Sequence, residues 1–278
     1  MPTIAEKRSA FRRLHEQGCF VIPNPWDIGS ARYLRQLGFK ALATTSAGIA
    51  FSQGSADGAV PRDAMLAHIR AVVEASDLPV NADYESGYAY ELEELVENVR
   101  LCVETGAAGL SIEDKTGDPA NPLYERDLAV ARIRAARAAI DGSGADVLLT
   151  GRAECFIVGR PDLEETIGRL QAYSRAGADC LYAPGIHTRE QIAAVVKAVA
   201  PNPVNFLAYG AIELTVAHLA ELGVRRISVG SALARAAWGG FLRAARGIAE
   251  QGRFDGLAEA EPFGELNRFF HDDHQRKP

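Results

Sequence analysis

The sequence predicts an α/β protein, a (β/α)8 barrel of eight parallel strands. Three observations predict this class. The chain has 278 residues, the usual size of one such barrel. Eight short apolar runs recur at steps of roughly 20 to 40 residues, the spacing of a strand followed by a crossover helix. Segments with apolar residues at helical spacing separate these runs.

The predicted strands are almost continuously apolar, which is typical of parallel strands buried on both faces. They cover residues 19–24, 40–45, 79–84, 109–114, 146–152, 179–184, 203–209 and 226–230. Because strand–helix–strand units are right-handed, eight of them close most naturally into a barrel.

Helices are predicted between the strands, most clearly at 30–38, 91–109, 163–179 and 189–201. A glycine follows the helical pattern and precedes the next strand at Gly38, Gly106, Gly177 and Gly223. Beyond the last strand, a strong helical pattern covers 232–252, and a shorter one lies near 261–270. No linker divides the chain, so we expect one domain over 1–278, with 232–278 as a C-terminal helical extension.

Composition excludes several functions. The net charge of −6 argues against a nucleic-acid partner. No apolar run approaches the ~20 residues of a membrane span, and the charged N-terminal segment lacks the apolar centre of a signal peptide. We therefore expect a cytoplasmic protein without a membrane partner. Its cysteines, Cys19, Cys102, Cys155 and Cys180, lie singly in apolar segments and are expected to be reduced and buried.

Acidic residues follow three of the predicted strands. Asp83 and Glu85 end the third, Glu113 ends the fourth, and Asp57 lies in the loop after the second. On an extended chain Asp83 and Glu85 would face the same side. Carboxylates that converge repel one another unless a cation is present, and all-oxygen ligands suit Mg²⁺. Each acid alone is better explained as a helix cap or an ion-pair partner, whereas the set predicts a metal site.

The fifth strand ends in Arg152, a charge that would not ordinarily be buried there. It is predicted either to clamp a substrate carboxylate or to pair with Glu154 or Glu113, and both alternatives stay open. The turn at Thr45-Ser46-Ala47-Gly48 offers backbone N–H groups for a second anion. The candidate general acids and bases are Tyr84, Tyr88, Tyr124, Glu154 and His187.

Six segments together resemble a known family, the isocitrate lyase and phosphoenolpyruvate mutase superfamily. They are NPWDIGSAR (24–32), TTSAGIAFSQGSADG (44–58), NADYESGYA (81–89), SIEDK (111–115), GRAECF (151–156) and PVNFL (203–207). The resemblance spans almost the whole chain. It implies a barrel, a Mg²⁺ cofactor that Mn²⁺ can replace, and a homotetramer whose subunits exchange a C-terminal helix.

The resemblance also implies roles for individual residues. Asp83 matches the direct metal ligand, and Glu85, Glu113 and Asp57 match acids that bind metal-bound waters. The substrate-contacting positions are matched by Trp26, Thr45, Ser46, Ala47, Asp83, Arg152 and Asn205. The residues with implied catalytic roles are Arg152, Glu113 and Asn121, the last on the loop after the fourth strand.

The common chemistry of the family implies a small 2-oxo or 2-hydroxy carboxylate as ligand, reacting through a metal-stabilised enolate. The loop at 115–126 lacks the Cys and His of the lyases, and Pro119 stands where the mutases have Lys. The first hypothesis is a C–C lyase acting on a di- or tricarboxylic acid. The second is C–P chemistry, as a phosphoenolpyruvate mutase or phosphonopyruvate hydrolase. The third is a weakly active protein that binds 2-oxo acids.

Overall fold

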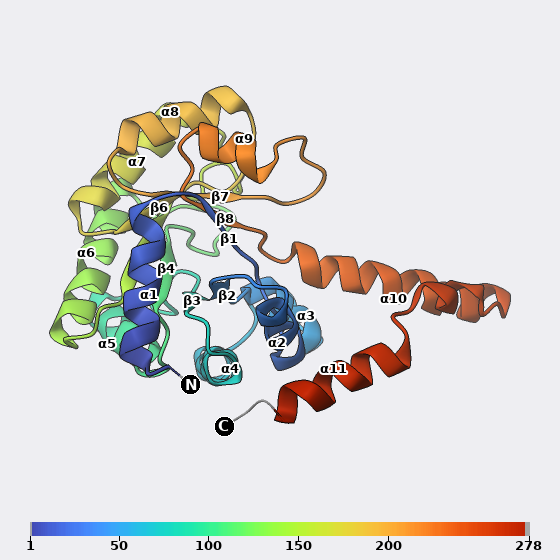
Figure 1. The fold of residues 1–278 in the computed structure, drawn as a ribbon. Helices are drawn as coiled ribbons and strands as arrows, with labels where there is room; N and C mark the ends of the chain where they lie inside the picture. The colour runs from blue at the N-terminus through green and yellow to red at the C-terminus, as the bar shows by residue number, and fades with distance from the viewer. Residues whose placement is uncertain (1, 276–278) are drawn as a thin grey trace. The chain divides into compact units, whose positions relative to one another are not determined.

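The computed structural model describes residues 2–275 and contains one sheet of eight parallel strands. The strands are β1 (Phe20–Ile22), β2 (Leu42–Ala43), β3 (Val80–Asp83), β4 (Gly109–Glu113), β5 (Leu148–Arg152), β6 (Cys180–Tyr182), β7 (Val204–Leu207) and β8 (Arg226–Ser228). Each strand lies within one of the eight predicted apolar runs. The order in the sheet is β1-β8-β7-β6-β5-β4-β3-β2, so β1 and β2 are the two ends that must meet to close a barrel (Figure 1).

The residues just after β1 close this gap. The backbone N–H of Ala43 donates to Pro23 O at 3.0 Å. The amide of Asn24 donates to Thr44 O at 2.8 Å and accepts from the N–H groups of Val229 and Gly230, both at 2.9 Å. One buried side chain thus links the ends of β1, β2 and β8. The strands form a nearly closed barrel, and the predicted (β/α)8 fold is confirmed.

Helices surround this sheet in chain order. They are α1 (Ile4–Glu16), α2 (Ile28–Gln36), α3 (Ser46–Ser52), α4 (Arg62–Ala75), α5 (Leu92–Glu104), α6 (Arg126–Gly142), α7 (Leu163–Arg175), α8 (Arg189–Val199) and α9 (Val216–Glu221). Side-chain caps begin several of them, and Thr3, Asp27, Thr188 and Thr215 each form a reciprocal capping box. The predicted turn at 45–48 differs from the structure, since α3 begins there with Thr45 as its N-cap.

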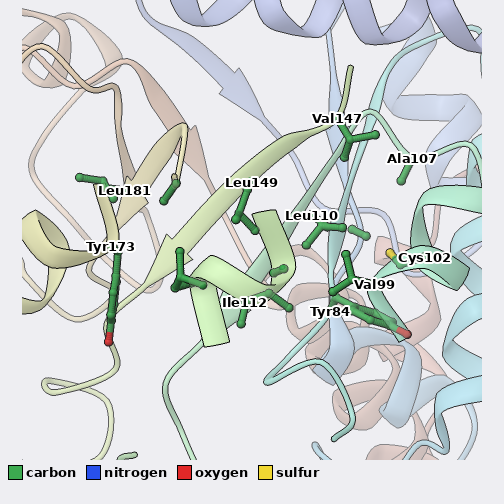
Figure 2. Close-up of a cluster of buried hydrophobic side chains, with 14 of the residues drawn as sticks. Tyr84, Val99, Cys102, Ala107, Leu110, Ile112, Val147, Leu149, Tyr173 and Leu181 are labelled. Carbon is green, nitrogen blue, oxygen red and sulfur yellow. The ribbon is translucent and has the colours of Figure 1, made fainter. Parts of the chain in front are cut away.

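The main hydrophobic core lies between the outer face of the strands and the helices. Figure 2 shows part of it, with Val99 and Cys102 of α5 beside Leu110 of β4. A smaller cluster includes Phe11 of α1, Ile22 and Leu148, so α1 packs on residues of the barrel interior. Cys102, Cys155 and Cys180 are buried and Cys19 is half-buried, and all four are free thiols.

By contacts, the chain divides into two compact units, Pro2–Ser231 and the residues from Ala232 onward. The second unit consists of α10 (Ala232–Gln251), the 3-10 helix η1 (Asp255–Glu259) and α11 (Phe263–Gln275). Its helices match the predicted patterns at 232–252 and 261–270, although α11 extends further. Among residues 2–275 no helix combines the length and apolar content that a membrane crossing needs.

Candidate active site

A cavity of about 160 Å³ lies inside the barrel, toward the carboxyl ends of the strands, and every strand contributes to its wall. The predicted site residues that line it are Thr45, Ser46, Ala47, Asp57, Asp83, Arg152 and Asn205. This is the face on which barrel enzymes carry their active sites. The structure therefore brings together residues from the start of α3 and from β3, β5 and β7 that lie up to 160 positions apart in the chain.

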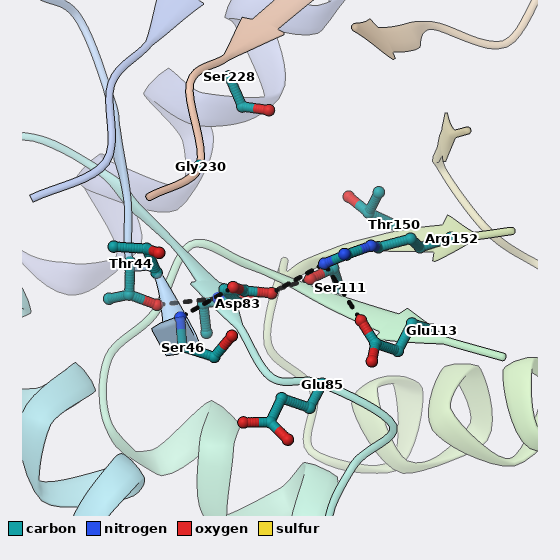
Figure 3. A network of polar contacts seen from close by, with 12 residues as sticks. Thr44, Ser46, Asp83, Glu85, Ser111, Glu113, Thr150, Arg152, Ser228 and Gly230 are labelled. Atoms are coloured by element: carbon teal, nitrogen blue, oxygen red, sulfur yellow. Dashed lines mark hydrogen bonds and ion pairs between the residues drawn. The ribbon is translucent and has the colours of Figure 1, made fainter. Parts of the chain in front are cut away.

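Asp83, the last residue of β3, is held in place from two sides. Its Oδ2 accepts a hydrogen bond of 3.0 Å from the backbone N–H of Ser46, and its own N–H donates to Thr44 Oγ1 at 2.9 Å. Its Oδ1 lies 3.3 Å from Nη1 of Arg152. Figure 3 shows these contacts converging on the carboxylate. The side chain is thus oriented before any ligand binds.

Arg152 ends β5 and forms ion pairs with three carboxylates. Its Nη1 lies 3.3 Å from Asp83 and 3.2 Å from Glu113, and its Nε donates to Glu154. The guanidinium also lies 5.1 Å from the centroid of the Tyr182 ring. Of the two alternatives for Arg152, the ion pair with Glu113 and Glu154 is therefore present in this structure. Its predicted contact with substrate stays a prediction.

Negative charge is in excess around Arg152. Five carboxyl groups interact there with two cations, Arg152 and Lys115; the carboxyl groups belong to Asp57, Asp83, Glu85, Glu113 and Glu154. Burial raises the pKa of Glu113 and of Glu154, and the Arg152 charge opposes both shifts. Nζ of Lys115 is 3.8 Å from Glu113, while Oε2 of Glu154 is buried without a partner. The two cations leave this group of acids undercompensated.

Glu85 does not lie as predicted. Strand β3 ends at Asp83, and Glu85 has a positive φ of 48°, so the chain turns and the two side chains are not on one extended face. Gly87 and Tyr88 in the same turn also have positive φ angles, of 83° and 56°. The Glu85 carboxylate accepts from Tyr88 OH at 2.9 Å, and burial raises its pKa to about 7. Figure 3 shows Glu85 apart from the Asp83–Arg152 network.

The donor set fits a hard divalent cation. The acids supply only oxygen ligands, and they outnumber the cations beside them. Burial raises the pKa of Glu85 and Glu113 because it disfavours the charged carboxylate, and a nearby cation would stabilise that charge. Within the described part of the chain, no three Asp, Glu, His or Cys side chains lie close enough to ligate one ion directly. The arrangement implied by the resemblance, with Asp83 as direct ligand and waters between the ion and the other acids, needs no such group.

Four predicted site residues do not line the cavity: Glu85 and Glu113, described above, and Trp26 and Asn121. Trp26 is half-buried just before α2, where its backbone N–H donates to Ser30 Oγ at 3.1 Å. Asn121 is exposed, and its amide donates to Asp118 at 3.2 Å within the loop after β4. This loop folds back on itself through a bridge between Lys115 and Leu123. The roles implied for Trp26 and Asn121 stay predictions.

None of the five predicted acid–base candidates lines the cavity, whereas Tyr182 does. Tyr84 donates to Asn98 O at 3.0 Å, away from the site, and His187 is exposed. Tyr182 lies opposite Arg152 in the register between β5 and β6, and burial raises its pKa to about 12. It is thus a neutral phenol near neutral pH, able to donate a proton. In the sequence, Tyr182 could have been recognised as a polar aromatic residue on an otherwise apolar strand.

A second set of polar and charged residues lies behind Glu154, the partner of Arg152. It too was not predicted from the sequence. Asp114 accepts from the N–H of Glu154 at 2.8 Å through Oδ1, while its Oδ2 accepts from Tyr173 OH at 2.6 Å and Arg169 Nη1 at 3.1 Å. Arg169 and Tyr173 belong to α7. Helix α7 therefore holds the acid that orients Glu154, which in turn pairs with Arg152.

The fold and the acidic cavity define an α/β-barrel protein whose site is suited to small anionic ligands and a divalent cation. The model of the phosphoenolpyruvate phosphomutase family matches residues 11–249. An uncharacterized protein of Mycobacterium tuberculosis is 33% identical over 260 residues, which cover 92% of this chain and 94% of that protein. Oxaloacetate decarboxylase of Paraburkholderia xenovorans is 32% identical over 237 residues, covering 82% and 76%.

Comparison with solved structures points to the same family. A candidate lyase/mutase from Burkholderia cenocepacia has 50% sequence identity and a TM-score of 0.93, covering 96% of this chain and 97% of that one. A 2,3-dimethylmalate lyase has 28% identity and a TM-score of 0.84, covering 100% and 98%. The chain belongs to the phosphoenolpyruvate mutase and isocitrate lyase superfamily. It is accordingly an enzyme of a superfamily of lyases and mutases.

Proposed function

We propose that this enzyme is a Mg²⁺-dependent lyase that cleaves a C–C bond in a small 2-oxo or 2-hydroxy di- or tricarboxylic acid. The observation that carries the proposal is the excess of carboxyl groups around Asp83 and Arg152, at the cavity wall. Mg²⁺ bound there would act as a Lewis acid on the oxygen atoms of the substrate. Mn²⁺ is expected to replace it because both ions favour oxygen ligands.

The protein's own groups orient the reactants. The N–H of Ser46 and Oγ1 of Thr44 fix Asp83, the residue that would hold the ion directly. The proposed water-mediated ligands are Glu85, Glu113 and Asp57, and Ser46 Oγ lies 3.2 Å from Asp57 Oδ1. Thr45, Ser46 and Ala47 line the cavity beside Asp83, where a substrate carboxylate would lie. Asn205, on the wall formed by β7, would contact the remainder of the substrate.

Cleavage leaves an electron pair on one carbon, and that carbon must receive a proton. The lyase motif of Cys and His is absent from the loop at 115–126. Tyr182 offers a proton donor within the cavity, and its raised pKa keeps the phenol protonated. We propose that Tyr182 replaces the missing loop donor.

The relatives suggest which acids to assay first. Two of them are named for oxaloacetate and for 2,3-dimethylmalate, and isocitrate and 2-methylisocitrate follow from the resemblance. Each acid is incubated with the enzyme in Mg²⁺, in Mn²⁺ and in EDTA, and products are followed by proton NMR. Metal-dependent cleavage of at least one acid is expected. If a 2-oxo acid binds with metal but none of the acids is turned over, the chain is a binder and not a lyase.

C–P chemistry is the second candidate, because the matching family model is that of a phosphomutase. The loop places Pro119 where mutases have a cation, and Lys115 is already beside Glu113 at 3.8 Å. Phosphorus NMR of phosphonopyruvate incubated with the enzyme and Mg²⁺ distinguishes the two functions. A new phosphoenolpyruvate or phosphate signal would favour this candidate over the C–C lyase.

We also propose that the enzyme is a homotetramer. The C-terminal unit exposes a series of large apolar side chains, at Leu233, Trp238, Phe241, Leu242, Ile248, Phe254, Leu257, Phe263, Leu266 and Phe270. Phe241 is 59% exposed and Phe263 is 83% exposed. Apolar surface of this extent is typical of protein interfaces. Other copies of this chain are the partners that the resemblance implies.

A further inference from the structure

Arg226 is a buried cation inside the barrel. It is the first residue of β8, lies opposite Asn205 of β7 in the register, and is 3% exposed. It lines the same cavity as Asp83 and Arg152. None of the contacts described for Asp83 and Arg152 involves it.

All hydrogen-bond partners of Arg226 are neutral. Nε donates to Asn205 Oδ1 at 2.7 Å, Nη2 donates to Thr150 Oγ1 at 3.0 Å, and Nη1 lies 3.3 Å from His15 Nε2. Nδ1 of His15 donates to Phe11 O at 2.8 Å, so Nε2 is the acceptor. Burial lowers the pKa of His15 to about 3, and the Arg226 charge adds to that shift. His15 is therefore uncharged at neutral pH.

The two arginines that line the cavity differ in whether a carboxylate neutralises their charge. Arg152 pairs with three carboxylates. No Asp or Glu among residues 2–275 forms an ion pair with Arg226. A guanidinium has five N–H groups, and the three contacts of Arg226 use three of them. A buried charge without a counter-ion is costly, so Arg226 is the cation in this cavity that still needs an anion.

The barrel interior leaves room for that anion. The interior of most such barrels is filled with bulky branched side chains. Here the cavity is lined by polar side chains, including Asn81, Ser111, Asn205 and Ser228. Arg226 lies two residues before Ser228 on β8, one inward-facing step of roughly 6.6 Å nearer the amino ends of the strands. The cavity thus extends from Asp83 near the rim to Arg226 on the floor.

We infer that Arg226 binds a second carboxylate of the substrate, the one farthest from the metal end. This inference rests on the proposed function and narrows its substrate to acids that carry a carboxylate on the far end of a short chain. The two remaining N–H groups of the guanidinium are the donors, and Asn205 and Thr150 hold it in position. The 2-oxo end lies at Asp83, Ser46 and Ala47.

Two ligands of equal carbon number test this in the unaltered enzyme. 2-Oxoglutarate and 2-oxovalerate share the 2-oxo acid end, but the far carboxylate of the first is a methyl group in the second. Their affinities are measured by calorimetry with saturating Mg²⁺. We expect 2-oxoglutarate to bind about 10- to 100-fold more tightly, the range for hydrogen bonds to a charged group.

Variants assign this preference to Arg226. In Arg226→Met the preference is expected to disappear, with the affinity for 2-oxovalerate unchanged, and Arg226→Lys is expected to retain part of it. The matched control is Arg225→Met, which removes the same charge from the neighbouring residue. Arg225 donates to Gly18 O and does not line the cavity. The control should keep the full preference.

The outcomes are distinguishable. Equal binding of both ligands by the unaltered enzyme overturns the inference and leaves the proposed function standing; a free inorganic anion on Arg226 would give this result. An undiminished preference in a folded Arg226→Met or Arg226→Lys variant also overturns it. Binding of neither ligand, with or without Mg²⁺, contradicts the proposed function and the inference with it. If Arg226→Met does not fold, the ligand pair and Arg226→Lys still decide.

Discussion

Nη1 of Arg152 lies 3.3 Å from Oδ1 of Asp83, so the carboxylate proposed to hold the metal already has a cation beside it. The same Nη1 lies 3.2 Å from Glu113. A divalent cation at Asp83 would therefore compete with the guanidinium for these oxygens. Such competition would release Arg152 toward a substrate carboxylate when the metal binds.

Replacing Arg152 with Met should raise the affinity for Mg²⁺ while abolishing turnover. The apo variant should be less stable, by about 3–5 kcal/mol, because the buried carboxylates lose their counter-ion. Mg²⁺ should then raise its melting temperature more than it raises that of the unaltered enzyme. Thermal melts across a Mg²⁺ titration measure this. An equal or smaller metal-induced shift would argue against competition.

Asp83→Asn should lower metal-dependent turnover by at least about 100-fold, since the proposed direct ligand loses its charge. Folding should be preserved, because the amide is isosteric and Arg152 keeps Glu113 and Glu154 as partners. Activity at saturating Mg²⁺ and the melting temperature in EDTA are the two measurements. Full activity in this variant would show that Asp83 is not the metal ligand.

Tyr182→Phe should lower kcat by about 100-fold or more, within the range for loss of a general acid, with little change in KM. Tyr84→Phe is the matched control, because the Tyr84 hydroxyl bonds Asn98 O outside the cavity. The control should lose about 1 kcal/mol of stability and keep its kcat. If both variants keep kcat, the proton comes from another group.

The buried His15 predicts a dependence of stability on pH. Its pKa is about 3 in the folded protein and about 6.5 when unfolded. Between these values the unfolded chain binds more protons, so the contribution is complete above pH ~6.5 and is lost as the pH falls toward 3. His15→Gln should flatten the slope by up to about 1.4 kcal/mol per pH unit. Urea unfolding between about pH 5 and 7.5 tests this, with the exposed His187→Gln as control.

The apolar side chains of α10 predict an effect on assembly. Phe241→Glu should lower the oligomeric state, because a charge in a desolvated apolar contact is unfavourable. Ala193→Glu adds the same charge to an exposed position of α8 and should leave assembly unchanged. Light scattering coupled to size exclusion reports the mass. An unchanged mass in Phe241→Glu would exclude this residue from the interface.

The strands were predictable because burial on both faces gives each one a local apolar signature, and all eight fall inside the predicted runs. The position of Glu85 was not predictable, because the strand ends at Asp83 and Glu85 adopts a positive φ of 48°, which is uncommon for a residue with a side chain. Tyr182 was missed because its inward direction follows from its register with Arg152. Arg226 carried the same signal as Arg152, a charge on an apolar strand.

In this barrel, the apolar residues that stabilise the fold are largely different from the polar residues that line the cavity. Most of the buried apolar residues belong to the main core between strands and helices, and the smaller cluster packs Phe11 of α1 against residues of the barrel interior. Residues such as Asn81, Ser111 and Ser228 can therefore be exchanged with little loss of the apolar packing that maintains the fold. A scaffold arranged in this way can acquire new substrates by changing its inner surface alone. That freedom offers a physical reason why one superfamily accommodates both lyases and mutases.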